Sequence, residues 1–284
     1  MAHPRDWFEF ARDPASGTEM VRAAFHAHAY DPHFHDQVLV GVTERGRQSF
    51  RCRRQWHHSL PGRVILFGPG ETHDGEAAEE SGFVYSMLYF DPGWLLDAAE
   101  ACAGRRIGTG LFDFPQVLQD EPALAPAIFA ATRQIARPDS AMHRDAALDA
   151  VVALLVQHYG AQPAAAGSNT VDHGIAARAR DAIDASLDAD IGLTRLADLA
   201  GTDRFRLHRS FKAAYGLAPH AWLVQRRLNL ARRLLAQGEV PAEAAAAAGF
   251  ADQSHMGRWF RRAFGMTPAA YRRACTNLPD TAGA

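Results

Sequence analysis

Three histidines have a spacing at which their ring nitrogens could share one ligand. His33 and His35 are separated by one residue, and His73 follows a Pro69-Gly70 pair typical of a tight turn, because glycine readily adopts a positive φ. Imidazole nitrogens in such a set bind iron, manganese or zinc. Histidines also line polar pockets or make ordinary structural hydrogen bonds, so the residues alone leave three roles open.

The cysteines predict neither a disulfide framework nor a cysteine-based zinc site. Cys52, Cys102 and Cys275 are odd in number and far apart, which is typical of a reducing cytoplasm. The arginines beside Cys52 would lower its pKa if the strand is exposed, so redox sensing is a hypothesis for this residue. The sequence has no recognisable nucleophile–base arrangement and no phosphate-binding glycine-rich loop. We therefore predict no enzyme and no cofactor.

The C-terminal part of the chain contains an internal repeat. An alanine precedes a glycine by four residues in both copies, at Ala197 and Gly201 and again at Ala245 and Gly249. Further matching residues follow, with one added position in the second copy: Phe211, Gly216, Pro219 and Trp222, then Phe260, Gly265, Pro268 and Tyr271. An ordinary helical bundle with solvated arginines is the alternative interpretation, and the matched copies argue against it.

Each copy predicts a helix-turn-helix unit, at about 193–214 and 241–264. A small residue lets two helices cross closely, and glycine permits the turn between them. Thr202 or Asp203, and then Asp252, are suitable N-caps for the second helix of each unit. We expect these second helices at 204–214 and 253–264, with a long helix from about 219 to 237 between the units.

The two predicted second helices are amphipathic. Their inner faces are apolar, with Phe205, Leu207 in part and Phe211, then Met256, Trp259 and Phe260. Their outer faces are polar and mostly basic, with Arg204, Arg206, His208, Arg209 and Lys212, then Gln253, Ser254, His255, Arg258, Arg261 and Arg262. Residues 174–275 hold 16 basic and 9 acidic side chains, although the whole chain has a net charge of −2. This asymmetry is typical of a nucleic-acid-binding domain joined to another domain.

The N-terminal part predicts short strands followed by helices. In residues 21–30, alternation places Phe25 on one face and His26, His28 and Tyr30 on the other. Further strands are expected at 37–42, 48–53, 63–67 and 83–89, and helices at 122–137 and 141–159. The second helix has a broad apolar stripe, which needs the barrel or a second subunit as its partner. No run predicts a transmembrane helix or a secretory signal, so we expect a cytoplasmic protein with no membrane contact.

Residues 175–274 resemble the DNA-binding domain of the AraC/XylS family of transcription regulators. The most specific stretch is AGFADQSHMGRWFRRAFGMTPAAYR at 248–272, supported by the first unit and by Arg227-Leu228 in the linking helix. The segment Ala244–Ala248 departs from the family, which usually has larger residues there. The His33-x-His35 segment and the stretch 62–73 resemble the two sequence blocks of cupin barrels, and more closely the sensor domain that often accompanies this DNA-binding module.

The resemblance implies an α+β protein: an N-terminal cupin-like β-barrel with flanking helices, and an all-α C-terminal domain of two helix-turn-helix units joined by a long helix. The expected divisions are a sensing barrel at 1–92, a helical dimerisation or packing region at 93–160, a linker at 161–173 and the DNA-binding domain at 174–275. Both second helices would enter successive major-groove segments of double-stranded operator DNA at a promoter. The predicted DNA contacts are Arg204, Phe205, Arg206, His208, Arg209, Lys212, Gln253, Ser254, His255, Arg258 and Arg262.

The barrel is expected to bind an unknown small-molecule effector. The candidate pocket residues are His26, His28, His33, His35 and His73. No metal is predicted, because metal-binding cupins usually place a glutamate four or five residues after the second histidine, where this chain has Leu39 and Val40. A homodimer and a contact with RNA polymerase are further expectations. The competing hypotheses are a cupin-type metal-dependent enzyme with a helical appendage, and an anti-regulator that has lost its DNA contacts.

Overall fold

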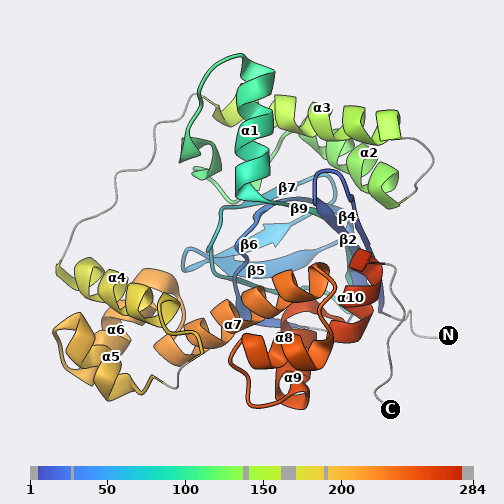
Figure 1. The fold of residues 1–284 in the computed structure, drawn as a ribbon. Helices are drawn as coiled ribbons and strands as arrows, with labels where there is room; N and C mark the ends of the chain where they lie inside the picture. Colours follow the sequence, from blue (N-terminus) through green and yellow to red (C-terminus); the bar gives the residue numbers. More distant parts are fainter. Residues whose placement is uncertain (1–5, 27–28, 137–140, 161–170, 189–190, 277–284) are drawn as a thin grey trace, which may run out of the picture. The chain divides into compact units, whose positions relative to one another are not determined.

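The computed structural model describes residues 6–26, 29–136, 141–160, 171–188 and 191–276 (Figure 1). Contacts divide the chain into two units: residues 1–30 with 34–166, and residues 31–33 with 167–284. Strand β3 (Tyr30–His33) is hydrogen-bonded within a sheet of the first unit and is described with it. Most of the predicted linker lies outside the described residues.

The N-terminal unit consists of two sheets followed by helices. The six-stranded sheet has the order β1-β2-β9-β4-β7-β10, and the four-stranded sheet has the order β3-β8-β5-β6. The strands are β1 (Trp7–Arg12), β2 (Glu19–Phe25), β4 (Val38–Gly46), β5 (Gln48–Cys52), β6 (Gln55–Ser59), β7 (Val64–Phe67), β8 (His73–Ala77), β9 (Phe83–Phe90) and β10 (Leu118–Gln119). Neighbouring strands β1 with β2, β2 with β9, and β9 with β4 pair antiparallel.

The larger sheet has an apolar core on each face, because successive side chains of a strand point to opposite sides. In β4, Val38, Val40 and Val42 join a core with the helices, whereas Leu39 joins residues of both sheets. The helices are α1 (Pro92–Ala103), the 3₁₀ helix η1 (Thr109–Phe112), α2 (Leu124–Ala136) and α3 (Ala141–Tyr159). Figure 1 shows α1, α2 and α3 together on one side of the sheets. The space between the two sheets is therefore the interior of the barrel.

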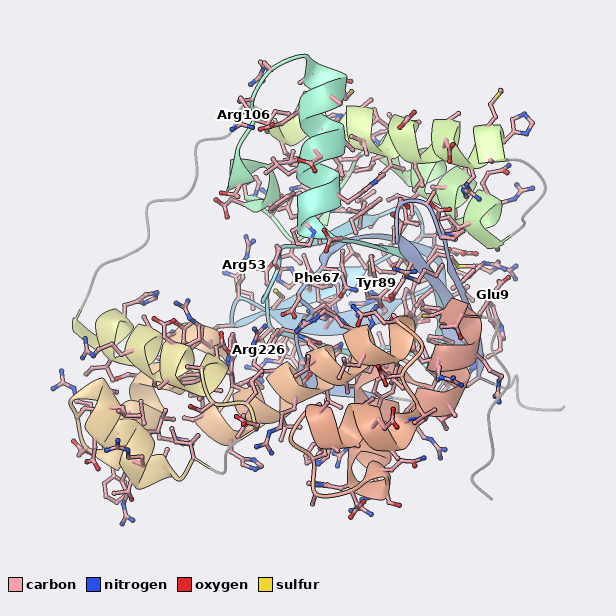
Figure 2. All side chains as sticks on the ribbon, viewed as in Figure 1. Glu9, Arg53, Phe67, Tyr89, Arg106 and Arg226 are labelled. Carbon is pink, nitrogen blue, oxygen red and sulfur yellow. The ribbon has the colours of Figure 1, made fainter. Side chains whose placement is uncertain are left out.

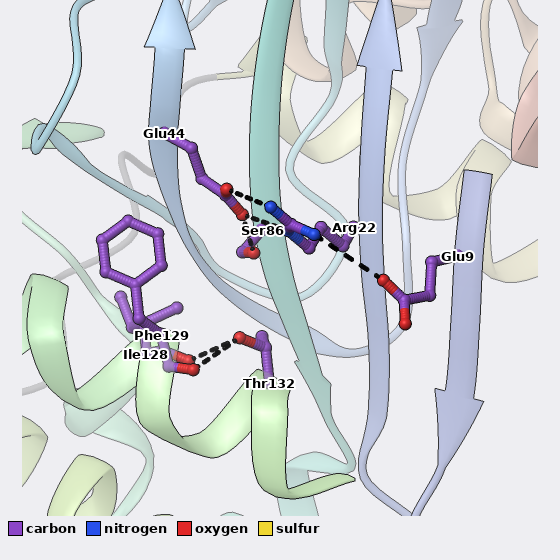
Figure 3. Close-up of polar contacts among 7 residues, drawn as sticks. All are labelled: Glu9, Arg22, Glu44, Ser86, Ile128, Phe129 and Thr132. Atoms are coloured by element: carbon purple, nitrogen blue, oxygen red, sulfur yellow. Dashed lines mark hydrogen bonds and ion pairs between the residues drawn. The ribbon is translucent and has the colours of Figure 1, made fainter. Parts of the chain in front are cut away.

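A polar network fixes three strands of the large sheet next to α2 (Figure 3). Arg22 donates two hydrogen bonds of 2.8 Å to the Glu44 carboxylate, and the Ser86 hydroxyl donates a third at 2.6 Å. Glu44 follows Thr43 at a register irregularity between β4 and β9. Burial opposes ionisation of Glu44, but these donors hold its pKa below the usual value. Arg22, Glu44 and Ser86 thus join β2, β4 and β9 by charge-assisted hydrogen bonds.

In the C-terminal unit, the regular elements described after residue 170 are all helices. Its helices are α4 (Val171–Asp184), α5 (Leu193–Ala200), α6 (Arg204–Tyr215), α7 (Pro219–Ala236), α8 (Pro241–Ala247), α9 (Gln253–Phe264) and α10 (Pro268–Thr276). The long helix α7 connects the first helix pair to the second, and its residues Leu228, Ala231 and Leu235 are fully buried. Among the described residues, no helix of either unit is long and apolar enough to cross a membrane.

The α+β class is confirmed, with both expected helix-turn-helix units and the linking helix. The continuous pattern predicted over residues 21–30 is wrong. Strand β2 ends at Phe25, and Tyr30 begins β3, so the two rings meet edge to face at 5.2 Å instead of lying on opposite faces. The apolar stripe of α3 finds its partner within the chain, because Leu148, Val151 and Leu155 are buried in the core shared with α1 and α2.

Candidate nucleic-acid interface and ligand chamber

The first helix-turn-helix unit is held by a glycine turn and an aspartate cap. Gly201 ends α5 in the left-handed conformation at φ 69°, which glycine adopts without steric cost. Asp203 is the N-cap of α6, and its Oδ1 accepts hydrogen bonds of 2.9 Å from the backbone N–H groups of Phe205 and Arg206. The Arg178 side chain donates to the Ala200 carbonyl at 2.7 and 3.0 Å. These contacts fix where the second helix begins.

The second unit repeats this arrangement with smaller side chains. Ala244, Ala245 and Ala248 are buried, so α8 approaches its neighbours closely through alanine alone. Gly249 has a φ of 79°, and a Cβ there would lie 2.5 Å from the Leu187 carbonyl oxygen. Asp252 caps α9 by accepting a hydrogen bond of 2.6 Å from the backbone N–H of His255. The alanine-rich helix is thus closely packed, although it lacks the larger residues that the family usually has there.

Most of the predicted DNA-contacting side chains lie on the outer faces of α6 and α9. The exposed residues are Arg204, Phe205, Arg206, His208, Arg209 and Lys212 in α6, and Gln253, Ser254, Arg258, Arg261 and Arg262 in α9. The inner faces carry Leu207, Ser210 and Phe211, then Met256, Phe260 and Ala263. The prediction that Phe205 belongs to the inner face is wrong. It is 63% exposed, and the Arg204 guanidinium lies 4.8 Å from its ring centre.

His255 differs from the other predicted contacts because its ring is engaged inside the unit. Its Nε2 accepts a hydrogen bond of 3.0 Å from the Trp259 indole, and its ring meets that of Phe250 edge to face at 5.7 Å. Trp259 is half-buried, and the Arg262 guanidinium lies 5.4 Å from its ring centre. Among the exposed arginines of α9, Arg262 is therefore held against this ring cluster.

The arginines of α7 have structural partners in this unit. Arg226, labelled in Figure 2, forms an ion pair of 2.8 Å with Asp184, and Arg227 donates to the Leu187 carbonyl. Arg232 is buried, donates to the Tyr271 hydroxyl at 3.2 Å and lies over the Phe264 and Tyr271 rings. The helix therefore uses its arginines to join α4 and α10.

The barrel interior is aromatic, with a few polar groups. Strand β9 contributes Phe83, Tyr85 and Met87 to the core between the sheets, with Tyr89 packed against it. Burial raises the pKa values of Tyr30 and Tyr85 well above the ordinary value, so both hydroxyls stay protonated. Neither tyrosine was among the predicted pocket residues, although the alternation from 83 to 90 places Tyr85 and Tyr89 on one face.

Three of the five predicted pocket histidines lie close together. His33, His35 and His73 are all buried, and one ring nitrogen of each lies within 4.8 Å of the other two. His26 instead lies beside Asp6, with 3.1 Å between its Nδ1 and the carboxylate. His28 lies outside the described residues. Phe67 and Tyr89, labelled in Figure 2, contact this cluster: the Phe67 ring stacks on His73 at 3.9 Å, and Tyr89 meets His35 at 5.2 Å.

One smaller expectation needs correction. Cys52 is buried, and burial followed by the nearby Glu71 carboxylate raises its pKa far above that of a free thiol, so the expected activation by neighbouring arginines is wrong. The neighbouring hairpin carries His57, which is partly exposed, and His58, which is exposed. His57 stacks on Phe50 at 5.1 Å, and His58 shares a hydrogen bond of 2.8 Å with Ser49.

Comparisons with known proteins agree with this geometry. The family model described as AraC-like ligand binding domain matches residues 16–152, and a helix-turn-helix domain model matches residues 196–274. A Bacillus subtilis (strain 168) protein described as the uncharacterized HTH-type transcriptional regulator YbfI is 27% identical over 245 residues, 86% of this chain and 87% of that protein. The transcriptional activator NphR of Rhodococcus sp is 42% identical over 87 residues, which are 30% of this chain and 26% of NphR.

A solved structure supports the fold over nearly the whole chain. The crystal structure of an apo ToxT variant from Vibrio cholerae matches 93% of this chain and 100% of its own, with a TM-score of 0.57. At 12% identity this similarity shows the fold alone. These similarities give no support to the cupin-enzyme alternative.

Proposed function

Since the chain belongs to the AraC/XylS family of DNA-binding transcription regulators with an N-terminal ligand-binding domain, we propose that α6 and α9 both read an operator, under the control of an effector in the barrel. The observation that carries this proposal is the pair of capped second helices with exposed basic faces. Helix α7 has 18 residues and is about 27 Å long, which suits units that enter successive major-groove segments about 34 Å apart.

Each exposed side chain has a role that follows from its chemistry. Arginine matches guanine O6 and N7, and glutamine matches adenine N6 and N7. Arg206, His208 and Arg209 would read bases from α6, and Gln253, Ser254 and Arg258 from α9. Phe205, exposed at the start of α6, suits a thymine methyl group. Arg204, Lys212 and Arg262, at the edges, would bind phosphates and supply the salt-dependent part of the affinity. His255 would contribute mainly through Trp259.

The N-terminal unit would hold the effector between its sheets. The aromatic interior with the Tyr30 and Tyr85 hydroxyls and the buried histidines suits a small, largely apolar molecule with a polar group. Such an effector controls DNA binding only if it binds two states of the protein with different affinity. The sensing region at 1–92, the helical region at 93–160, the linker at 161–173 and the DNA-binding region at 174–275 are part of this proposal.

Three further features complete the proposed function. The chain would act in the cytoplasm, where its DNA is, and would catalyse no reaction. A homodimer would double the phosphate contacts on a repeated operator, although the α3 stripe is already buried within the chain and gives no support for it. A contact with RNA polymerase would convert operator binding into promoter control.

Fluorescence anisotropy with the full chain tests the proposal. The protein should bind its own upstream intergenic DNA far more tightly than a scrambled duplex, and the affinity should fall steeply with salt. Equal and weak binding to both duplexes, and to a genomic fragment library with and without candidate effectors, would contradict it.

A further inference from the structure

The second recognition helix has a glycine in its interior. Gly257 lies in α9, which runs from Gln253 to Phe264 and is helical on both sides of the glycine. Glycine loses more backbone freedom than any other residue when a helix forms, and apart from proline it is the least favourable residue inside one. A glycine at this position therefore needs a compensating reason.

Neither the backbone conformation nor the packing of the described chain supplies that reason. Gly257 has no positive φ, whereas Gly249, in the turn before α9, has a φ of 79° that favours glycine. A Cβ at Gly249 would lie 2.5 Å from the Leu187 carbonyl oxygen, whereas a Cβ at Gly257 would meet no atom within 4 Å. Alanine would fit at 257 and would favour the helix. The reason for glycine therefore lies in a molecule that α9 contacts.

Gly257 borders the polar face of the helix. Residues three and four positions away are its neighbours on the helix surface. Three of these neighbours are exposed, namely Gln253, Ser254 and Arg261. The fourth, Phe260, is buried. The glycine is therefore a low point on the helix surface, beside the side chains that are proposed to contact DNA.

The charge and the side-chain lengths of this face favour DNA as the molecule that approaches. Arg258 and Arg261 are exposed, and α9 contains no acidic residue. Ser254 has a short side chain, so its hydroxyl reaches a base edge in the major groove only when the helix backbone lies close to the base pairs. Glycine is the residue that lets a backbone approach a ligand closely.

We propose that Gly257 is a specificity-determining residue of α9, because its missing side chain lets the helix backbone come close enough to the major groove for Gln253 and Ser254 to contact base edges. This inference rests on the proposed reading of an operator by α9. A larger residue at 257 holds the helix away from the groove, and hydrogen bonds to base edges weaken steeply as their geometry worsens. Long arginine side chains still reach the phosphates after such a shift, so the loss is confined to base reading.

Substitutions of Gly257 in the full-length protein separate this role from helix stability. In fluorescence anisotropy, Gly257→Ala should raise the Kd for operator DNA about tenfold, as expected for the loss of one base contact, and Gly257→Leu should raise it further. On a scrambled duplex, both variants should bind within about twofold of the wild type and with the same salt dependence, because no charge changes. The Tm of Gly257→Ala should equal or exceed that of the wild type.

A second helical glycine provides the matched control. Gly174 lies inside α4, and a Cβ there would make an ordinary contact of 3.5 Å with the Arg178 side chain. Gly174→Ala makes the same chemical change outside the recognition helices, so it should bind operator DNA with wild-type affinity.

Selection of bound duplexes from a pool randomised over the operator identifies the bases concerned. Gly257→Ala should lose base preference in one major-groove segment and keep it in the segment that α6 reads. Wild-type affinity in both Gly257 variants, or an equal loss on operator and scrambled DNA, would overturn the inference and leave the proposed function intact. A wild type that does not distinguish the two duplexes would overturn the proposed function and this inference together.

Discussion

The aspartate cap of the first recognition helix gives a prediction whose magnitude follows from the structure. Asp203 Oδ1 accepts two backbone hydrogen bonds of 2.9 Å, from Phe205 and Arg206. Replacing an aspartate N-cap by alanine costs about 1 kcal/mol, whereas asparagine caps nearly as well. Asp203→Ala and Asp203→Asn remove the same charge, so their difference isolates the cap from the electrostatic effect of an acid close to DNA.

Hydrogen exchange measured by mass spectrometry reports this difference locally. The peptide that contains the first turn of α6 should exchange about fivefold faster in Asp203→Ala than in Asp203→Asn, because about 1 kcal/mol corresponds to that factor. Anisotropy on operator DNA should show up to about a fivefold weaker Kd in the alanine variant, since this turn carries Arg204, Phe205 and Arg206. Asp198→Ala is the matched control, because this exposed acid of α5 is not a cap.

The pH dependence of the cap has a defined sign. The hydrogen bond from the backbone N–H of Arg206 lowers the pKa of Asp203 most; desolvation opposes this shift, and the N–H of Phe205 adds to it, so the pKa lies below the ordinary value of 3.8. A depressed folded-state pKa gives stabilisation that is present above about pH 4 and is lost as the pH falls through the folded value. Equal exchange in the alanine and asparagine variants at neutral pH would refute the capping argument.

Three further predictions concern single residues. Arg209→Ala should weaken operator binding by about 1–3 kcal/mol and relax the base preference at one position. Arg133→Ala, at an exposed arginine of α2, is the control and should bind as the wild type does. An equal loss of affinity on scrambled DNA would show that Arg209 contacts a phosphate and not a base. Gly249→Ala should lower the free energy of unfolding, measured in urea, by about 1–3 kcal/mol, because residue 249 has a φ of 79° and the added Cβ would clash with the Leu187 carbonyl oxygen. Gly257→Ala is the control: the added Cβ meets open space, so the free energy of unfolding should be unchanged or higher. In the presence of peroxide, Cys52→Ser should bind operator DNA with the same affinity as the wild type, because the buried thiol has a raised pKa. Loss or gain of affinity under peroxide in the wild type alone would support the redox hypothesis.

The helical half of the molecule was predictable because its signals are local. Gly201, Asp203 and Asp252 act through their own backbone neighbours, so residue type and spacing are enough to place the turn and both caps. The exception is Phe205. The 3.6-residue period places it near the edge of the apolar stripe, and the packing of α6 against its neighbours decides on which side of that edge it lies.

The barrel was predictable only in part, because its determinants are distant in sequence. Strands β4, β7 and β9 contain apolar runs, whereas β3, β6 and β8 are mostly polar and depend on their pairing partners. His33, His35 and His73 were predicted as one candidate set from the sequence, whereas no local pattern encodes the hydrogen bond from the Gly70 N–H to the His35 carbonyl.

Chemical interference footprinting on the isolated operator tests most directly the central claim that α6 and α9 both read bases. If α6 and α9 both read bases, chemical modification of guanines and thymines should interfere with binding in two major-groove segments on one face of the duplex. Their centres should lie about 10 base pairs apart. In Asp203→Ala, base modification should interfere less in one segment, and the interference in the other segment should be unchanged. A single interfering segment, or two segments on opposite faces, would contradict reading by both helices.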